Sequence, residues 1–378
     1  MKKIKNALIS VYDKKNLYLL LKNLVKYKIQ IISSGGTFKE IRKLGFKCLE
    51  VSKYTDFPEI LDGRVKTLHP KIHAGILSKR NNNSHLKDLK KNNFEEIDLV
   101  VVNFYPFEKT LKSTNNHNKI IENIDVGGPA MVRAAAKNYN DVTVITKSEQ
   151  YYKLIEELNN NNGSTSLDYR QKMSEEAFAE TAYYDALIAN YFNNKSKNLF
   201  PNKKLIFGNL IEKLRYGENP HQEAAIYSKS NKLNIDQLHG KQLSYNNYND
   251  IFSALIISKS LPKNTGTVIV KHSNPCGVSI NKNGVESYKL ALSCDPISAF
   301  GGIVSCNFKI KKKLAIELNK LFLEVVIGNG IENDALKVLK RKKNLRVINA
   351  KDLKLNDLQN VVCNFNSILV QSSDANAF

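Results

Sequence analysis

Apolar and polar residues alternate in short blocks along residues 1–147. Four of these blocks are rich in β-branched residues, which is typical of buried strands, and blocks with a helical apolar stripe separate them. Strands that alternate with helices indicate a parallel sheet covered by helices, so this part is predicted to be an α/β domain. The strand runs are NALISVY, KIQIISS, DLVVVNFY and DVTVIT, and the helical blocks include KNLYLLLKNLVKY and TFKEIRKLG.

A longer helical pattern occupies residues 174–192, and the polar residues 193–198 are typical of a linker. Beyond them, the strand-then-glycine runs TGTVIVKHSNPCGV, AFGGIVSCNF and LEVVIGNGI alternate with helical patterns, which predicts a second α/β domain. We therefore expect a first domain over 1–147, a helical connector and linker over 148–199, and a second domain over 200–378. The long helix should pack its apolar stripe against the core or a partner, and that stripe comprises Phe178, Ala182, Tyr183, Ala186, Ile188, Ala189 and Phe192.

The composition, with 42% hydrophobic and 25% charged residues, is typical of a globular protein. No apolar run is long enough to span a bilayer, and the stretch ALISVY near the basic N-terminus is too short for a signal-peptide core. The five cysteines form no CxxC pair, which argues against structural zinc and against a disulfide framework. These features predict a cytoplasmic protein with no membrane partner.

The formal net charge of +21 raises the hypothesis of nucleic-acid binding, because a basic surface attracts polyanions. However, only eight of the 57 cationic residues are Arg, which reads phosphate and base edges better than Lys does. Few aromatic residues lie among the basic runs either. We attribute the excess of Lys to codon bias and expect no nucleic-acid partner.

The segment IQIISSGGTFKEIRKL places a Gly-Gly turn between a strand and a helix. Bare backbone N–H groups at such a helix N-terminus favour an anion such as phosphate. Thr37 and Glu40 have the spacing of a capping box at the start of this helix. A Gly-Gly turn before a helix is more often plain turn chemistry, so the hypothesis of a phosphate site depends on the other segments.

A second Gly-Gly turn lies in IDVGGPAMVRAAAKN, which predicts a helix with Pro129 at its first position. Asp125 lies just before that helix, and Lys137 lies near its end. If Asp125 reaches Lys137, a carboxylate and an ammonium group share a proton-handling site. The alternative is an ordinary structural salt bridge.

The stretch LDGRVKTLHPKIHAGIL has no helical stripe over its first ten residues. If GRVKTL is extended, Arg64 and Lys66 project to the same side, and the Arg charge readies Lys66 for proton transfer or oxyanion binding. The alternative is a solvated basic loop. Asn103 and Tyr105 follow a buried strand, where parallel sheets place their ligands.

Together these segments resemble the cyclohydrolase domain of the bifunctional AICAR transformylase/IMP cyclohydrolases of purine biosynthesis. The resemblance extends over almost the whole chain and is most specific in the stretch that contains Lys66. It is carried by ALISVYDK, ISSGGT, DFPEILDGRVKTLHPKIHAGIL, IDLVVVNFYPF, IDVGGPAMVRAAAKN, LRYGENPHQEAAIY, GKQLSYNNYND, VKHSNPCGV and DPISAFGGIV.

For the first domain, the resemblance implies a fold similar to methylglyoxal synthase and closure of the ring of FAICAR to give IMP, with no metal required. It implies that Lys66 and Tyr105 act at the formyl oxygen of the substrate. Asp125 and Lys137 are implied to relay protons at its amide. Substrate and phosphate binding is implied for Ser10, Lys14, Ser34, Gly36, Thr37, Arg64, Thr67, Asn103 and Gly127.

For the second domain, the resemblance implies a cytidine-deaminase-like fold and formyl transfer from the co-substrate 10-formyltetrahydrofolate to AICAR. Lys271 and His272 end a predicted strand and are implied to be catalytic, although a lone His is more often a structural hydrogen bonder. Half of a zinc-deaminase signature is present, but position 279 is Ser instead of Cys, so no metal is expected. The implied substrate-binding residues are Arg215, Tyr216, Asn274, Phe300, Gly301 and Gly302.

The chain stops after NSILVQSSDANAF, whereas the family continues with a second deaminase-like half. We therefore expect only the first part of a transformylase domain, with doubtful formyl transfer and an aggregation-prone C-terminal region. The resemblance also implies a homodimer. Two alternatives stay open: a monofunctional cyclohydrolase with a vestigial second domain, and a non-catalytic nucleotide-sensing module.

Overall fold

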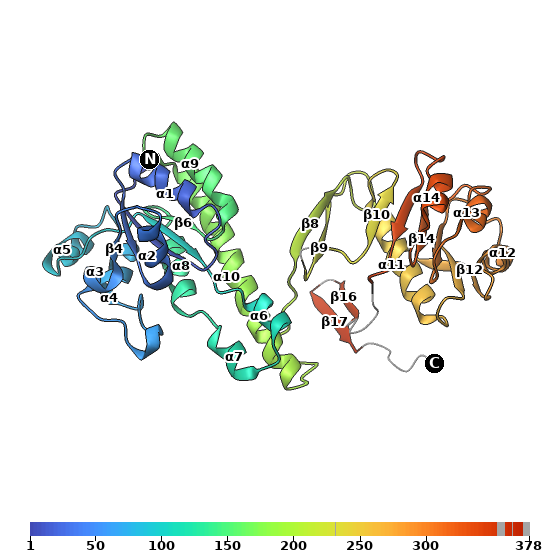
Figure 1. The fold of residues 1–378 in the computed structure, drawn as a ribbon, viewed down its shortest axis with the longest axis horizontal. Helices are drawn as coiled ribbons and strands as arrows, with labels where there is room; N and C mark the ends of the chain where they lie inside the picture. The colour runs from blue at the N-terminus through green and yellow to red at the C-terminus, as the bar shows by residue number, and fades with distance from the viewer. Residues whose placement is uncertain (231, 354–359, 365, 373–378) are drawn as a thin grey trace. The chain divides into compact units, whose positions relative to one another are not determined.

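The computed structural model describes residues 1–230, 232–353, 360–364 and 366–372. The chain divides into two compact units, Met1–Leu205 and Ile206–Phe378 (Figure 1). Each unit has its own sheet and its own hydrophobic core, and each is described by itself below.

The first unit is built on a five-stranded sheet in the order β4-β3-β2-β5-β6. All of its strand pairs are parallel, and Leu8 of β2 pairs with Ile32 on one side and with Val100 on the other. The four strand runs predicted from the sequence are therefore confirmed, as is the parallel α/β arrangement. The strands are β2 (Asn6–Val11), β3 (Gln30–Ser33), β4 (Leu49–Glu50), β5 (Leu99–Asn103) and β6 (Thr143–Ile145).

Helices connect the parallel strands and cover both faces of this sheet. A short antiparallel pair, β1 (Lys2–Lys3) with β7 (Ser164–Thr165), lies outside it. The helices are α1 (Leu17–Lys26), α2 (Gly35–Lys43), α3 (Val51–Thr55), α4 (Pro70–Leu77), α5 (Asn83–Lys91), α6 (Phe107–Ser113), α7 (His117–Glu122), α8 (Gly127–Lys137), α9 (Tyr151–Asn160) and α10 (Leu167–Lys195), with the 3-10 turns η1 (Leu61–Gly63) and η2 (Ser148–Gln150).

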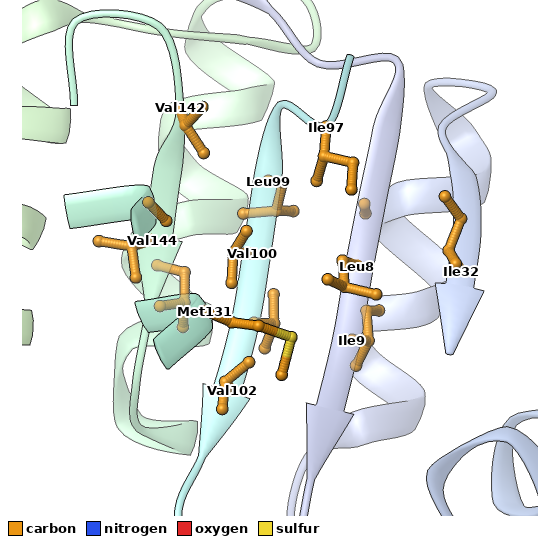
Figure 2. Close-up of a cluster of buried hydrophobic side chains, with 14 of the residues drawn as sticks. Leu8, Ile9, Ile32, Ile97, Leu99, Val100, Val102, Met131, Val142 and Val144 are labelled. Atoms are coloured by element: carbon orange, nitrogen blue, oxygen red, sulfur yellow. The ribbon is translucent and has the colours of Figure 1, made fainter. Parts of the chain in front are cut away.

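The core of the first unit lies on both faces of the central strand β2 and of its neighbour β5. Consecutive residues such as Leu8 and Ile9 are both fully buried, as expected for a parallel sheet that is covered on two sides. Met131 of α8 packs against this sheet, and Val100 and Val102 of β5 belong to the same cluster (Figure 2). The ends of β2 and β5 are thereby held rigidly, which positions the loops that follow them.

Helix α10 buries a face that differs from the predicted stripe. Phe178 and Phe192 are 40% and 45% exposed, whereas Ala186 is buried, so these two phenylalanines do not pack in the core of the chain. The other predicted possibility, that the stripe packs against a partner, stays a prediction. The helix packs closely on α8 and β6 mainly through smaller side chains. No helix among the described residues, the 29-residue α10 included, is long and apolar enough to cross a membrane. The buried residues are Arg170, Met173, Ser174, Ala177, Thr181, Tyr184 and Ala186.

The second unit contains a six-stranded mixed sheet in the order β10-β15-β14-β13-β11-β12. Strands β13, β14 and β15 are parallel, and the other pairs are antiparallel. The three predicted strand-then-glycine runs are confirmed as β11, β13 and β14. The sheet strands are β10 (Asp236–His239), β11 (Gly266–Lys271), β12 (Asn274–Ile280), β13 (Ile303–Cys306), β14 (Val325–Gly328) and β15 (Arg346–Asn349), and two further pairs are β8 (Asn209–Leu214) with β9 (Ala224–Ser228) and β16 (Asn360–Asn364) with β17 (Ser367–Gln371).

Alternate residues of β11 enter two different cores. Ile269 packs in a cluster with residues of α12, α13 and α14, whereas Val268 and Val270 pack in a cluster with residues of α11. The sheet is therefore covered on both faces. Residues 373–378, in the C-terminal region predicted to aggregate, lie outside the described residues. The helices are α11 (Tyr245–Ser260), α12 (Gly284–Cys294), α13 (Lys312–Leu318) and α14 (Asn333–Leu339).

Candidate functional site

A tight loop precedes α4 in the first unit and carries the most specific sequence motif. Ile60 and Val65 form an antiparallel bridge that closes this loop around η1, and Arg64 has helical backbone angles. The prediction of an extended GRVKTL is therefore wrong, because the glycine at position 63 has φ +85° and turns the chain. The Arg64 guanidinium forms an ion pair with Glu122 of α7, with 3.2 Å between Nε and Oε1. Its charge is directed at that carboxylate.

The Lys66 side chain runs across two glycines whose backbones are left-handed. A Cβ added to Gly63 would overlap Lys66 Cε, and a Cβ added to Gly35 would lie 3.0 Å from Lys66 Nζ. The ammonium group also lies 3.3 Å from Glu59 Oε2, and 29% of the side chain is exposed. Lys66 Nζ is thereby held at the first turn of α2.

Helix α2 begins at Gly35, two residues before the predicted capping box. Ser34 is the N-cap and makes no side-chain cap hydrogen bond. Thr37 lies inside the helix, where its hydroxyl donates to Val11 O at 2.9 Å and accepts from Val11 N at 3.0 Å. The capping-box prediction is therefore wrong. Thr37 instead ties the first turn of α2 to the end of β2, and Gly36 stays exposed.

Helix α8 begins directly beside the same loop. A Cβ added to Gly127 would lie 2.9 Å from Thr67 Oγ1, so the Thr67 hydroxyl contacts the first residue of α8. Lys66 and Thr67 are consecutive and therefore bring the N-termini of α2 and α8 to one place. Unpaired N–H groups and the helix dipole make each N-terminus favourable for an anion, and Lys66 adds a full positive charge.

Asp125 lies immediately before α8, and its carboxylate Oδ1 accepts the Gly128 N–H at 2.8 Å. Burial raises the pKa of Asp125, and hydrogen bonds from the backbone N–H groups of Gly128 and Tyr105 oppose that rise. A carboxylate whose pKa is raised accepts a proton more readily. Asp125 therefore has the properties of a general base next to the two helix N-termini.

The structure does not bring Asp125 and Lys137 together. Asp125 precedes α8, and Lys137 is the exposed last residue of that helix. At a rise of about 1.5 Å per residue, the two ends of this helix lie about 15 Å apart. The predicted direct contact is therefore wrong, because the helix that follows Asp125 carries the chain away from it.

The loop after β2 closes the site on its other side. Asn103 Oδ1 accepts the backbone N–H groups of Tyr12 at 2.6 Å and Asp13 at 3.0 Å, so its side chain is occupied in holding that loop. Lys14 Nζ donates to Tyr12 O at 3.2 Å. The rings of Tyr12 and Tyr105 meet edge to face at 5.7 Å, and 44% of Tyr105 is exposed.

In the first unit, the structure thus groups many of the predicted residues around the N-termini of α2 and α8. Sequence reasoning missed Glu59 and Glu122, which bind Lys66 and Arg64. The sequence does show acidic residues in or near this basic loop, which could have indicated ion pairs. Which carboxylate pairs with which cation, however, depends on the fold. The predicted residues at or beside the two helix starts are Ser34, Gly36, Arg64, Lys66, Thr67, Asp125 and Gly127, and those on the neighbouring strand ends and the loop after β2 are Ser10, Lys14, Asn103 and Tyr105.

In the second unit, His272 and Ser273 form the tight turn between β11 and β12. Both residues are left-handed, with φ 52° and 60°, which is the geometry of a type I′ hairpin turn. Asp250 of α11 accepts the Ser273 N–H at 2.7 Å, and Asn274 Nδ2 donates to His272 O at 2.9 Å. Such backbone angles cost about 1–3 kcal/mol in non-glycine residues and cluster at functional sites.

The Lys271 side chain points to the segment that precedes β13. Its Nζ donates to Phe300 O at 3.1 Å, and the exposed Phe300 ring packs on Phe322 at 5.2 Å. A Cβ on Gly302 would lie 3.1 Å from two backbone oxygens, so this position has little room for a side chain. Gly301 is left-handed at φ +75°. The structure therefore brings the predicted residues Lys271 to Asn274 and Phe300 to Gly302 together.

Arg215 and Tyr216 form a second group of predicted residues in this unit. The Arg215 guanidinium lies 5.6 Å from the centre of the Tyr216 ring. Burial lowers the pKa of Arg346. The negative charge of Glu324 opposes this decrease, and the positive charge of Arg215 adds to it. Sequence reasoning missed Arg346, Glu324 and Asp250. Helix α11 connects the two groups, because its Asn247 binds Glu324 at 2.9 Å and its Asp250 binds Ser273.

The two halves of the partial zinc-deaminase signature lie in different settings, because residues 221–223 form an exposed turn before β9 whereas residues 275–276 belong to β12. Cys276 lies in β12, and its thiol donates to Ile269 O at 3.6 Å. Within the described residues, no three His, Cys, Asp or Glu side chains gather in a group that could hold a metal ion.

Comparison with known families gives two matches. The profile of the AICARFT/IMPCHase bienzyme family matches residues 135–378, and that of MGS-like domains matches residues 16–130. Among solved structures, the chain titled "Crystal structure of ForH" is 30% identical with a TM-score of 0.46, covering 50% of this chain and 97% of that chain.

Curated relatives with the name "Bifunctional purine biosynthesis protein PurH" are similar over most of the chain. The protein from Rhizobium rhizogenes is 45% identical over 351 residues, which cover 91% of this chain and 65% of the relative. The protein from Acetivibrio thermocellus is 43% identical over 390 residues, which cover 98% of this chain and 75% of the relative. The chain thus spans about two thirds of the length of the first of these relatives.

Proposed function

Because the chain belongs to the AICARFT/IMPCHase bienzyme family, we propose that it acts in purine biosynthesis through two activities. The first unit closes the ring of FAICAR to give IMP. The second unit transfers a formyl group from the co-substrate 10-formyltetrahydrofolate to AICAR. The observation that carries the first activity is the position of Lys66 Nζ at the start of α2, next to the start of α8 and Asp125.

Ring closure joins two groups of one molecule, so holding them together supplies much of the rate. The carboxamide nitrogen attacks the formyl carbon, and the electron pair of the formyl C=O bond moves to its oxygen. Lys66 and the Tyr105 hydroxyl stabilise the negative charge that develops there. Asp125 accepts a proton from the attacking nitrogen. One proton from each of the two nitrogens finally leaves with the formyl oxygen as water.

The substrate phosphate would bind at the N-termini of α2 and α8. Ser34 supports this role because its hydroxyl makes no cap hydrogen bond, and exposed Gly36 leaves the backbone accessible. Arg64 would exchange its ion pair with Glu122 for the phosphate. Thr37 and Asn103 contribute by holding the surrounding backbone, since their side chains already bond to Val11 and to the loop after β2.

In the second unit, His272 would act as general base and Lys271 as the stabiliser of the formyl oxygen during transfer. The AICAR amine attacks the formyl carbon, the bond from that carbon to the folate nitrogen breaks, and the amine proton passes through His272 to that nitrogen. Arg215 and Tyr216 would bind the nucleotide. The left-handed backbone of His272 and the exposed ring of Phe300 support a ligand site at this edge of the sheet. We also propose that the chain acts as a homodimer, which sedimentation velocity would test.

The purified chain should be assayed with FAICAR, and in parallel with AICAR plus 10-formyltetrahydrofolate, while IMP is measured in both. IMP in both samples supports both activities. IMP from FAICAR alone supports a monofunctional cyclohydrolase and contradicts formyl transfer by this chain. Tight nucleotide binding without IMP in either sample would contradict the enzymatic proposal and favour a nucleotide-sensing module.

A further inference from the structure

The hydroxyl of Tyr184, on helix α10, reaches the backbone just before α8. It accepts the Asp125 backbone N–H at 2.8 Å, and it lies 3.4 Å from Asn123 O, to which it donates. Tyr184 is 59 residues away from Asp125 in the sequence. Figure 1 shows α10 continuing past α8 towards α6, and α10 contacts both helices.

The Tyr184 ring is fixed by its packing. It lies 5.0 Å from the Phe104 ring and 6.2 Å from the Phe107 ring, and only 5% of the residue is exposed. Together with Ile120 of α7, Tyr184 and Phe107 form a small core of their own. A ring held on several sides presents its hydroxyl at one point, so the hydrogen bond to Asp125 is directional.

Asp125 is therefore held from three elements at once. Tyr184 of α10 fixes its backbone, Gly128 of α8 fixes one carboxylate oxygen, and the backbone of Tyr105 after β5 also donates to the carboxylate. The Tyr184 contact fixes the position of the Asp125 backbone, and the contacts from Gly128 and Tyr105 fix the orientation of its carboxylate. A general base must lie within hydrogen-bond reach of the proton that it removes, so all three contacts act on catalysis.

We propose that Tyr184 is a positioning residue for Asp125 in ring closure. This inference rests on the proposed function of the first unit. Burial raises the pKa of Tyr184 to about 12, so the hydroxyl stays protonated near neutral pH and can donate and accept at once. Tyr184 lies outside residues 16–130, the segment that matches MGS-like domains. The hydrogen bond that holds the Asp125 backbone therefore comes from α10, which is not part of that segment.

The test is Tyr184→Phe in the full chain, which keeps the ring and removes the hydroxyl. Tyr191→Phe is the matched control, because it removes a 2.8 Å hydroxyl contact to His117 from the same helix without touching Asp125. Tyr184→Phe should lower kcat for FAICAR closure about tenfold at nearly unchanged KM, since a misplaced base weakens the transition state more than substrate binding. Tyr191→Phe should leave both constants unchanged.

Hydrogen exchange at the Asp125 amide provides a readout that does not depend on activity. Loss of the Tyr184 hydroxyl should speed exchange at this amide, while Tyr191→Phe should not. A wild-type chain that fails to convert FAICAR would overturn the proposed function, and the exchange rate would still decide whether Tyr184 holds Asp125. If kcat and amide exchange are both unchanged in Tyr184→Phe, the positioning role is wrong.

Discussion

The ammonium group of Lys66 lies against Gly35, at the distance where a side chain on that glycine would begin to touch it. A Cβ at Gly35 would lie 3.0 Å from Lys66 Nζ, and Gly35 has a left-handed φ of +53°. Both observations make this position selective for glycine, the first because of space and the second because of backbone strain.

We therefore expect Gly35→Ala to lower the free energy of unfolding by about 1–2 kcal/mol, the cost of left-handed backbone in a non-glycine residue. Because the methyl group also displaces Lys66 Nζ, affinity for FAICAR should fall. Urea unfolding followed by circular dichroism and titration calorimetry with the nucleotide measure the two effects.

Gly36→Ala is the stability control for that substitution. A Cβ at Gly36 meets nothing within 4 Å, and its φ is not left-handed. Its free energy of unfolding should stay unchanged or rise by up to about 1 kcal/mol, because Ala favours a helix over Gly. Equal losses of stability in the two variants would contradict the special geometry assigned to Gly35.

Lys66→Met should lower kcat for ring closure roughly 100- to 1,000-fold, the usual effect of removing one group that stabilises an oxyanion. Lys71→Met is the control. Lys71 pairs with Asp56 at 3.4 Å, much as Lys66 pairs with Glu59 at 3.3 Å, but its ammonium group lies over the Tyr54 ring of α3 at 5.2 Å. We expect near wild-type kcat for the control, and a comparable loss in both variants would speak against a catalytic role of Lys66.

The separation of Asp125 and Lys137 along α8 predicts independent effects on turnover. Groups more than about 7–10 Å apart usually contribute additively, whereas members of one proton relay do not. We expect the loss in kcat/KM for the double variant Asp125→Asn with Lys137→Met to equal the product of the two single losses. A double variant no worse than the poorer single variant would show that the two residues act as a unit.

Asp125→Asn should change how stability depends on pH. Burial raises the pKa of Asp125 above its ordinary value of 3.8, so the native state binds this proton more tightly than the unfolded state does. The wild type therefore loses stability as pH rises from about 3.8 through the native pKa, and Asn removes that loss. Unfolding free energies of both proteins across this window should show the variant gaining on the wild type as pH rises.

Ser273→Gly should raise the free energy of unfolding of the second unit by about 1 kcal/mol, because glycine adopts the left-handed angles of this turn without strain. The 2.7 Å hydrogen bond from its backbone N–H to Asp250 does not depend on the side chain, and the hydroxyl contact to Asp250 that the variant loses is long, at 3.4 Å. Ser293→Gly, at an exposed site inside α12, should instead destabilise. A loss of stability in Ser273→Gly would contradict strain at the turn that presents His272.

The strands and most helices could be predicted from the sequence because their signals are local. The runs that became β2, β3, β5 and β6 are rich in β-branched residues and lie between helical stripes, and this pattern reports burial without knowledge of any partner. The two Gly-Gly pairs likewise marked the regions where α2 and α8 begin, since a glycine's backbone freedom is a property of the residue itself. The prediction that Pro129 is the first residue of its helix is wrong, because α8 begins at Gly127 and Pro129 is its third residue.

Contacts between distant segments could not be read in this way. Thr37 had the spacing of a cap, but α2 starts earlier and its hydroxyl binds Val11 instead. Arg64 was expected to act on Lys66, but the left-handed Gly63 turns the loop. As a result, the two cations form ion pairs with different carboxylates, Arg64 with Glu122 and Lys66 with Glu59. In each case the local pattern was compatible with several partners.

The sequence by itself therefore determined the α/β class, the family resemblance and the chemical groups available to the site. The tertiary structure alone decided which of those groups meet. It brought Lys66 to Gly35 and Tyr184 to Asp125, and it placed Lys137 at the far end of α8. The physical reason is that periodicity and backbone preference act over a few residues, whereas these contacts depend on how the sheet and α10 bring separate loops together.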